Sequence, residues 1–380
     1  MNDAADWMGI WGIILIVALI SIRQSFKTTT QHRLSDHDSR LVKAAALCAA
    51  GLLTVTAVFN IWVNPWDIYG TDFFQSRMVP SRRQKLGYYA QLNTTPELIV
   101  MGNSTAFAIS PQYIQETIGY TSFNWSIDAG RPAENRALLE YLSRQYPVGF
   151  PKVILMQVSE KPSNHYYDMT PVQLLPYLPP REMLAQGTER LSKLFSISQW
   201  ADSAYVVRNT IENPTNQWGG WLFTEDGYGY KFDDRFSKAL TPEQINKFPN
   251  CNIPKKYRDE NIEDILAFVD EQNSSIVFYI SPLLPEFYNT YLQDAQNFQN
   301  CHQTIAAYFT ELSQNHNNVF FKDYLVLEHM NGLDAPEGFY DERHLKPENG
   351  ERLIDALADT LEQAYDVAET KRSVDPGDTE

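Results

Sequence analysis

The stretch Glu97-Leu-Ile-Val-Met-Gly-Asn-Ser104 decides the fold, because it joins a short apolar strand to a glycine turn and a serine. From this point onward, segments of strand-like composition alternate with segments of helical spacing. Strands separated by helices indicate βαβ units, and so an α/β fold in which a mostly parallel sheet lies between two layers of helices. The other strands are expected at 122–125, 152–158, 276–280 and 319–321, and the helices at 110–119, 132–145 and 348–368.

A second motif, Phe339-Tyr-Asp341-Glu-Arg-His344-Leu-Lys-Pro347, places an aspartate and a histidine three residues apart just before the last predicted helix. In an open parallel sheet, ligands bind beyond the carboxyl ends of the strands. Ser104 follows the first strand and Gly130 follows the second. Asp341 and His344 follow the fifth, so all of these residues are expected at one edge of the sheet. We predict that Ser104 is a nucleophile, with His344 as its base and Asp341 orienting the imidazole.

Each motif also has an ordinary structural explanation when it is taken alone. Gly-Asn-Ser is a common turn between a strand and a helix, and Asp341 with His344 is compatible with a helix start and a surface histidine. The order of the two motifs along one α/β pattern favours the catalytic interpretation. If Ser104 begins a helix, its backbone N–H also faces the site, where it would stabilise developing negative charge.

The composition narrows the classes of function. Of the 380 residues, 43% are hydrophobic, which is ample for a packed core, and the net charge of -16 argues against nucleic acid as a partner. The Cys/His spacing of a zinc site does not occur, and we predict neither a metal nor a cofactor. Cys251 and Cys301 are expected either to form one disulfide or to remain part-buried thiols, and the sequence favours neither alternative.

Two apolar runs near the amino terminus, Trp7 to Ile22 and Ala44 to Val63, predict a pair of transmembrane helices. The first run lacks the basic start and the cleavage site of a signal peptide. Residues 1–66 are therefore expected to form an inner-membrane anchor, followed by an extracytoplasmic domain over 67–370 and a disordered tail over 371–380. The domain is periplasmic if the cell is Gram-negative. The loop between the helices is expected in the cytoplasm because it is basic. Its basic residues are Arg23, Lys27, Arg33, Arg40 and Lys43.

A long segment, about residues 160–270, separates the third strand from the fourth and is rich in proline, glycine, asparagine and aromatic side chains. A stretch of this length inside a compact fold is usually a functional insertion. Flat rings such as Trp218 and Trp221 suit sugar rings, so the insertion is a candidate substrate groove. The alternative, that most of these aromatic side chains form a small core of the insertion, is favoured.

These motifs resemble those of the SGNH, or GDSL-like, hydrolase superfamily. The segment Gly102-Asn103-Ser104 is similar to its first block, with asparagine where many members have aspartate. The segment from Phe123 to Gly130 is similar to its second block, whose glycine N–H joins the oxyanion hole. Asp341 and His344 have the spacing of its fifth block. The resemblance implies a flavodoxin-like three-layer sandwich with Ser104 and Gly130 as oxyanion donors.

The resemblance covers about residues 95–160 and 274–365, and it has a gap at the third block. The third strand ends in Met156-Gln-Val-Ser-Glu160, without the Gly-x-Asn-Asp motif that normally supplies an asparagine to the oxyanion hole. Ser159 or Asn164 is a candidate replacement, and Asn103 and Asn164 are candidate substrate-binding residues. Membrane-tethered proteins similar to the alginate acetylation proteins and the teichoic acid D-alanyl transfer protein share both the anchor and the degenerate third block.

Two hypotheses of function follow. The first is a membrane-anchored acyl-ester hydrolase or O-acyltransferase that modifies a cell-surface polysaccharide, with a membrane-bound O-acyltransferase as an implied partner. The second is an SGNH-fold subunit without activity that binds glycan or acts as a scaffold in an export complex. The missing third block favours the second, whereas the Asp341 and His344 pair favours the first. A lipid or peptidoglycan esterase is a third, weaker alternative.

Overall fold

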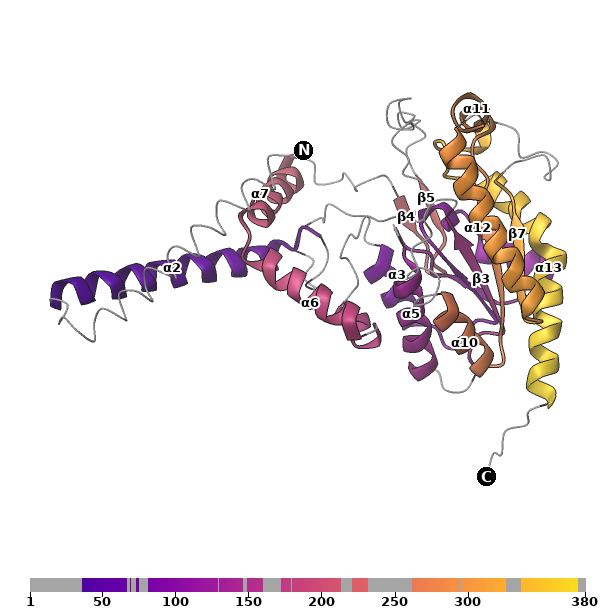
Figure 1. Ribbon diagram of the computed structural model, residues 1–380, viewed down its shortest axis with the longest axis horizontal. Helices are drawn as coiled ribbons and strands as arrows, with labels where there is room; N and C mark the ends of the chain where they lie inside the picture. The colour runs from indigo at the N-terminus through magenta and orange to yellow at the C-terminus, as the bar shows by residue number, and fades with distance from the viewer. Residues whose placement is uncertain are drawn as a thin grey trace. The chain divides into compact units, whose positions relative to one another are not determined.

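Figure 1 shows a computed structural model of the chain, which divides into two compact units. The sheet unit comprises Trp66–Gly70, Arg77–Gln186 and Asn216–Glu380. The helical unit comprises Met1–Pro65, Thr71–Ser76 and Gly187–Thr215. The structure describes residues 36–66, 69, 73–74, 81–128, 130–145, 149–159, 172–178, 180–212, 221–231, 262–293, 295–325 and 336–374.

Five parallel strands form the centre of the sheet unit. They are β1 (Leu98–Met101), β2 (Ser122–Asn124), β3 (Val153–Val158), β6 (Ser275–Ile280) and β7 (Val319–Asp323). Their order across the sheet is β2-β1-β3-β6-β7. Counted along the chain this is 2-1-3-4-5, the strand order of flavodoxin-like folds, whose ligand site lies at the switch between the first and third strands. The predicted α/β class with a mostly parallel sheet is confirmed.

Helices cover both faces of this sheet. The main ones are α3 (Ser81–Tyr89), α4 (Pro111–Ile118), α5 (Pro132–Gln145), α10 (Glu263–Glu271), α12 (Gln296–Asn315) and α13 (Pro347–Val374). The helices α4 and α13 pack together, and α5 packs with α10. This pairing follows from right-handed crossovers. The connection from β1 to β2 runs one way across the sheet and the later connections run the opposite way, so their helices lie on opposite faces.

The elements on either side of Ser104 are firmly held. Every residue of the central strands β1, β3 and β6 is buried, and continuous apolar runs are typical of parallel strands covered on both faces. The helix α4 begins and ends where its sequence signals predict. Ser110 Oγ accepts the Tyr113 N–H at 3.2 Å, and Gly119 ends the helix with φ 81°.

An antiparallel hairpin from the predicted insertion packs on the sheet unit. Its strands are β4 (Trp221–Phe223) and β5 (Gly229–Lys231). The Gly229 N–H donates to Phe107 O at 3.0 Å, and the Asn124 N–H donates to Asp226 O at 2.9 Å. These bonds join the hairpin to the backbone that follows β1 and to the end of β2. The insertion therefore reaches the carboxyl edge of the sheet, where the predicted nucleophile lies.

In the helical unit, α2 (Asp36–Val63) contains the second predicted transmembrane run. Of the helices in the described ranges, it alone is long and apolar enough to cross a membrane, over Arg40–Val63. The first run lies outside the described residues, so a pair of transmembrane helices stays a prediction. Arg40 and Lys43, predicted to lie in the loop, are helical because α2 already begins at Asp36, and the cytoplasmic side of these residues stays a prediction. The helix α7 (Ile197–Glu212) and the last turns of α6 (Pro180–Leu194) belong to the same unit.

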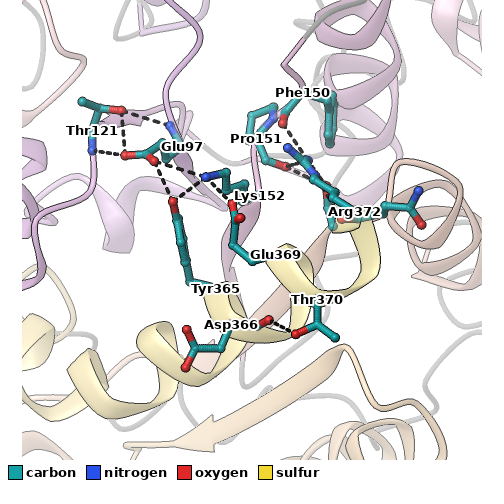
Figure 2. Close-up of polar contacts among 12 residues, drawn as sticks. Glu97, Thr121, Phe150, Pro151, Lys152, Tyr365, Asp366, Glu369, Thr370 and Arg372 are labelled. Atoms are coloured by element: carbon teal, nitrogen blue, oxygen red, sulfur yellow. Dashed lines mark hydrogen bonds and ion pairs between the residues drawn. The ribbon is translucent and has the colours of Figure 1, made fainter. Parts of the chain in front are cut away.

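The carboxyl-terminal helix α13 is tied to the amino edge of the sheet, as Figure 2 shows. The Tyr365 hydroxyl donates to Glu97 Oε1 at 2.8 Å and accepts a hydrogen bond from Lys152. Arg372 donates to Phe150 O at 2.8 Å and to Pro151 O at 3.2 Å. The helix therefore continues through residue 374, into the segment predicted to be a disordered tail.

Candidate active site

The turn after β1 presents Ser104 at the carboxyl edge of the sheet. Gly102 has φ 132°, and a side chain there would lie 2.6 Å from Gln157 Cβ, so glycine is required. Asn103 caps the short 3-10 turn that begins at Ser104, because its Oδ1 accepts from the Thr105 N–H (2.9 Å) and hydroxyl (2.8 Å). The amide oxygen of Asn103, a predicted substrate contact, is therefore engaged in holding the turn.

Asp341 and His344 lie on a compact loop that precedes α13. Backbone hydrogen bonds close this loop, from the Tyr340 N–H to His344 O (2.8 Å) and from the Lys346 N–H to Gly338 O (2.9 Å). Asp341 Oδ1 also accepts the backbone N–H of His344 at 2.9 Å. The aspartate thus fixes both the backbone and the ring of the histidine three residues later.

The structure brings the three predicted side chains into one hydrogen-bonded series. Ser104 Oγ lies 2.9 Å from His344 Nε2, although the two residues are 240 positions apart in the chain. His344 Nδ1 lies 2.8 and 2.7 Å from the two carboxylate oxygens of Asp341. Nδ1 therefore donates its proton to the carboxylate, which leaves Nε2 to accept from the Ser104 hydroxyl. A base-activated serine requires this arrangement.

Asp341 is buried yet ionised. Burial by itself raises the pKa of its carboxyl group, but the hydrogen bond and charge of His344 outweigh burial, together with the backbone N–H groups of Arg343 and His344. The pKa of Asp341 is therefore held well below its ordinary value. An aspartate that stays ionised at neutral pH can hold the imidazole in one tautomer and stabilise it when it carries a second proton.

The two predicted oxyanion donors differ in their hydrogen bonding. Within the described residues the backbone N–H of Ser104 has no acceptor, so it can donate to an oxyanion. The N–H of Gly130 donates to Ile127 O at 3.0 Å. A side chain at Gly130 would lie 2.3 Å from Gly102 O, so this segment packs directly on the nucleophile turn. To bind an oxyanion, the Gly130 N–H must share or release its present acceptor.

Gln157 belongs to the site but was not singled out from the sequence. It is buried near the end of β3, where its Oε1 accepts the Asn103 N–H at 3.3 Å and its Nε2 donates to Val158 O at 2.7 Å. Because both ends of its amide are engaged, Gln157 supports the nucleophile turn and does not offer a donor to substrate. The available signal was one polar residue in an otherwise apolar, buried strand.

Trp221, a predicted substrate contact, packs on the imidazole of His344. The two ring centroids are 5.5 Å apart and the rings meet edge to face. Trp221 also contacts Phe107 (4.9 Å) and Tyr340 (5.7 Å), and only 7% of it is exposed. A ring this buried packs against the catalytic loop instead of presenting a face to a sugar, which differs from the predicted role.

Lys85, from α3, is fully buried beside the same aromatic side chains. Its Nζ lies 4.8 Å from the ring centroid of Phe107, 4.9 Å from that of Phe223 and 3.3 Å from Asn124 Oδ1. Burial lowers the pKa of Lys85 well below its ordinary value, and the charge of Asp226 only partly opposes this effect. The sequence offered no sign of this lysine, because its burial depends on the distant hairpin.

Some predicted residues are not placed. Asn164, Trp218 and Cys251 lie outside the described residues. Ser159, the other candidate third-block replacement, is partly buried just after β3. Cys301, on α12, is disulfide-bonded and so is not one of two free thiols.

Comparison with solved structures finds distant matches, including the two that follow. No protein-family model and no curated protein matches the chain. A Streptococcus pneumoniae protein provisionally described as a platelet activating factor is 14% identical, with 74% of this chain and 92% of that chain covered, at a TM-score of 0.33. A Bacteroides fragilis protein provisionally described as an acylhydrolase is 12% identical, with 77% and 95% covered, also at 0.33. The function is therefore argued from the geometry of the site itself.

Proposed function

We propose that this chain is a serine acyl-ester hydrolase or O-acyltransferase that works through an acyl-enzyme on Ser104. The observation that carries the proposal is the series of hydrogen bonds from Ser104 through His344 to the buried, ionised Asp341. A binding site has no need of a serine, a base and an orienting carboxylate in this order. The resemblance of three motifs to the SGNH hydrolases supports the same chemistry.

In the first half-reaction, His344 Nε2 takes the proton of the Ser104 hydroxyl while Oγ attacks the carbonyl carbon of the ester. The Ser104 N–H stabilises the tetrahedral oxyanion. When the intermediate collapses, the imidazolium gives its proton to the departing alkoxide and the acyl group stays on Ser104. Water or a sugar hydroxyl then attacks the acyl-enzyme, with His344 again as the base. The proton finally returns to Ser104 as its bond to the acyl carbon breaks.

The proposed setting is a membrane-anchored protein whose catalytic domain lies outside the cytoplasm and modifies a cell-surface polysaccharide. The exposed apolar helix α2 supports the anchor. The aromatic-rich insertion and the resemblance to membrane-tethered proteins of polysaccharide acylation support the glycan substrate. The inner membrane, the glycan and a membrane-bound O-acyltransferase that supplies the acyl group would then be its partners.

A second candidate is a glycan-binding or scaffolding subunit that keeps the fold without the activity. Two observations favour it. The Gly130 N–H is bonded to Ile127 O, and Gln157 stands near the end of the strand where the family places its oxyanion asparagine. Removing one oxyanion donor typically costs about 10²–10³ in rate, so a slow enzyme is also compatible with these contacts.

A serine-reactive fluorophosphonate probe tests the proposal on the full-length chain. Wild type, Ser104→Ala and His344→Ala are labelled side by side, with Ser110→Ala as the control. Ser110 caps the nearby helix α4 and is not part of the relay. We expect labelling of wild type and of Ser110→Ala, and loss of labelling in the other two variants. A folded wild type that takes up no probe would support the binding subunit instead.

A further inference from the structure

The helical unit buries polar side chains and exposes apolar ones. Asn60 of α2, and Gln199 and Ser203 of α7, are all buried. Large apolar side chains lie on the surface of the same unit. Around the junction of α6 and α7 they are Leu191 (60% exposed), Phe195 (42%), Ile197 (52%) and Trp200 (46%), and Ile211 (73%) is exposed farther along α7. In water this distribution is unfavourable, because apolar area that stays exposed contributes no hydrophobic stabilisation, and buried polar groups need hydrogen-bond partners inside the protein. The distribution suits surroundings that are themselves apolar.

The buried polar groups hold the three helices together. Asn60 Nδ2 donates to Leu194 O at the end of α6 (2.9 Å), and Ser203 Oγ of α7 donates to Asn60 Oδ1 (3.0 Å). Side-chain hydrogen bonds between helices are a common means of association in lipid. The rings of Phe59 and Trp200 lie 5.6 Å apart beside these bonds. One asparagine of α2 thus fixes the turn between α6 and α7 to the end of the candidate membrane span.

This contact lies at the level where a membrane-water boundary is expected. Asn60 is in the last turn of the span, and the ring of Trp62 meets that of Phe74 edge to face at 5.2 Å. Aromatic rings gather at the boundaries of a bilayer because one end of the ring is apolar and the other tolerates water. Trp200, which packs against Phe59, adds a ring from α7 at the same end of α2.

The length and charges of α6 and α7 argue against either helix crossing the membrane. The 16 residues of α7 extend about 24 Å, which is shorter than the roughly 30 Å of a hydrocarbon core. Ion pairs also lie on both helices, Glu189 with Lys193 at the start of the apolar segment and Arg208 with Glu212 beyond it, each at 2.8 Å. A short helix pair with an apolar turn and charged flanks is typical of an element that lies in the interface.

We propose that residues 191–200, which join α6 to α7, insert into the head-group boundary of the bilayer beside the carboxyl end of α2. The partner is the lipid surface itself. The inference rests on the membrane-anchoring part of the proposed function, because the apolar turn continues the exposed surface of α2. The protein then has a second membrane contact, formed by the insertion between β3 and β6 and far from the amino terminus in sequence.

The test uses the full-length protein in lipid nanodiscs and a maleimide fluorophore at single positions. The native Cys48, exposed on α2, reports on the anchor. In a Cys48→Ala background, Ile197→Cys reports on the turn. Glu212→Cys is the matched control, an exposed position on the same helix. Each label is quenched in turn by nitroxide-bearing lipid and by aqueous iodide. The Cys48→Ala chain without an added cysteine gives the background.

We expect nitroxide lipid to quench the labels at Cys48 and Ile197→Cys several-fold more than iodide does, and the reverse at Glu212→Cys. Lipid quenching at Cys48 with iodide quenching at Ile197→Cys would overturn the inference and leave the anchor intact. Iodide quenching at both would overturn the anchor and the inference together. A label at Ile197→Cys shielded from both quenchers would mean that protein covers the turn, which also overturns it. Labelling of Ser104 by fluorophosphonate is independent of all these outcomes.

Discussion

The contact of Trp221 with His344 assigns a role to one residue of the insertion. In the proposed mechanism the imidazole moves a proton twice per turnover and must keep its orientation, and edge-to-face ring pairs are worth about 0.5–1.5 kcal/mol beyond the area they bury. Because Trp221 also fills the space between Phe107 and Tyr340, its removal would loosen the catalytic loop. We regard Trp221 as a positioning residue for the base.

Trp221→Ala should therefore lower kcat for ester hydrolysis by roughly 10- to 100-fold, since small misplacement of a reacting group is costly. Trp221→Phe keeps an aromatic ring in place and should recover most of the rate. A rise in KM alone, with kcat as in wild type, would indicate lost substrate binding and would contradict a positioning role.

Lys85 predicts a pH-dependent stability. Its pKa in the folded protein lies below the ordinary value of 10.5, so the unfolded chain binds more protons at pH values between the two. Stability therefore rises as the pH increases through this interval, and the lysine is most unfavourable at lower pH. Lys85→Met keeps the volume of the side chain, and Asn124 Oδ1 still accepts the Ser126 N–H at 3.0 Å.

We expect Lys85→Met to stabilise the protein by about 1–4 kcal/mol at pH 7, and by less as the pH approaches 10.5. Urea denaturation at pH 7 and pH 10 measures both values. Lys322→Met is the matched control, because Lys322 is exposed on β7. If Lys85→Met destabilised the protein at pH 7, the hydrogen bonds of the ammonium group would outweigh its burial.

At the scale of elements, the helix α13 depends on its last turns as well as on its apolar face. The guanidinium group of Arg372 donates hydrogen bonds to the carbonyl groups of Phe150 and Pro151, two residues that lie just before β3. Arg372→Ala should cost about 1–3 kcal/mol, because the carbonyl of Phe150 loses its Arg372 donor, whereas Pro151 O keeps the Ser274 hydroxyl at 2.6 Å. Ser373→Ala, at an exposed neighbouring position, should have little effect.

Urea denaturation measures this cost, and probe labelling of Ser104 serves as the second readout. The network of Arg372 lies at the amino edge of the sheet, whereas Ser104 lies at the carboxyl edge. Labelling of the folded variant should therefore match that of wild type. Stability equal to wild type would show that water replaces the arginine without loss.

The elements that the sequence predicts well are those with local signals. The helix α4 begins at a serine cap followed by proline and ends at Gly119, so its bounds are confirmed within one residue. The strand β1 is a pure apolar run. The pairing of Asp341 with His344 is also local, three residues apart on one loop. The contact of Ser104 with His344 was inferred from strand order, because the carboxyl ends of parallel strands share one edge.

The contacts that the sequence could not predict are long-range packing contacts. Trp221 meets His344 and Lys85 meets Phe107 because the β4–β5 hairpin folds onto the sheet, and no periodicity specifies that arrangement. The bond from Asn103 to Gln157 joins two strand ends that are 54 positions apart. The extension of α13 beyond residue 370 depends on the partners of Arg372, which lie on other segments.

At the scale of the whole molecule, sequence separation determines when the site can exist during synthesis. The proposed nucleophile, Ser104, and its proposed base, His344, are 240 residues apart, and His344 lies in the loop before the last helix. At about 5–20 residues per second, a ribosome needs roughly 12–48 s to make the chain between them. The serine is therefore produced early but remains an ordinary alcohol until almost all of the protein has emerged. In pulse-labelled cells, a fluorophosphonate probe should react with finished chains and leave ribosome-bound ones untouched. Late activation of this kind would keep an unfinished chain from acylating or deacylating its surroundings.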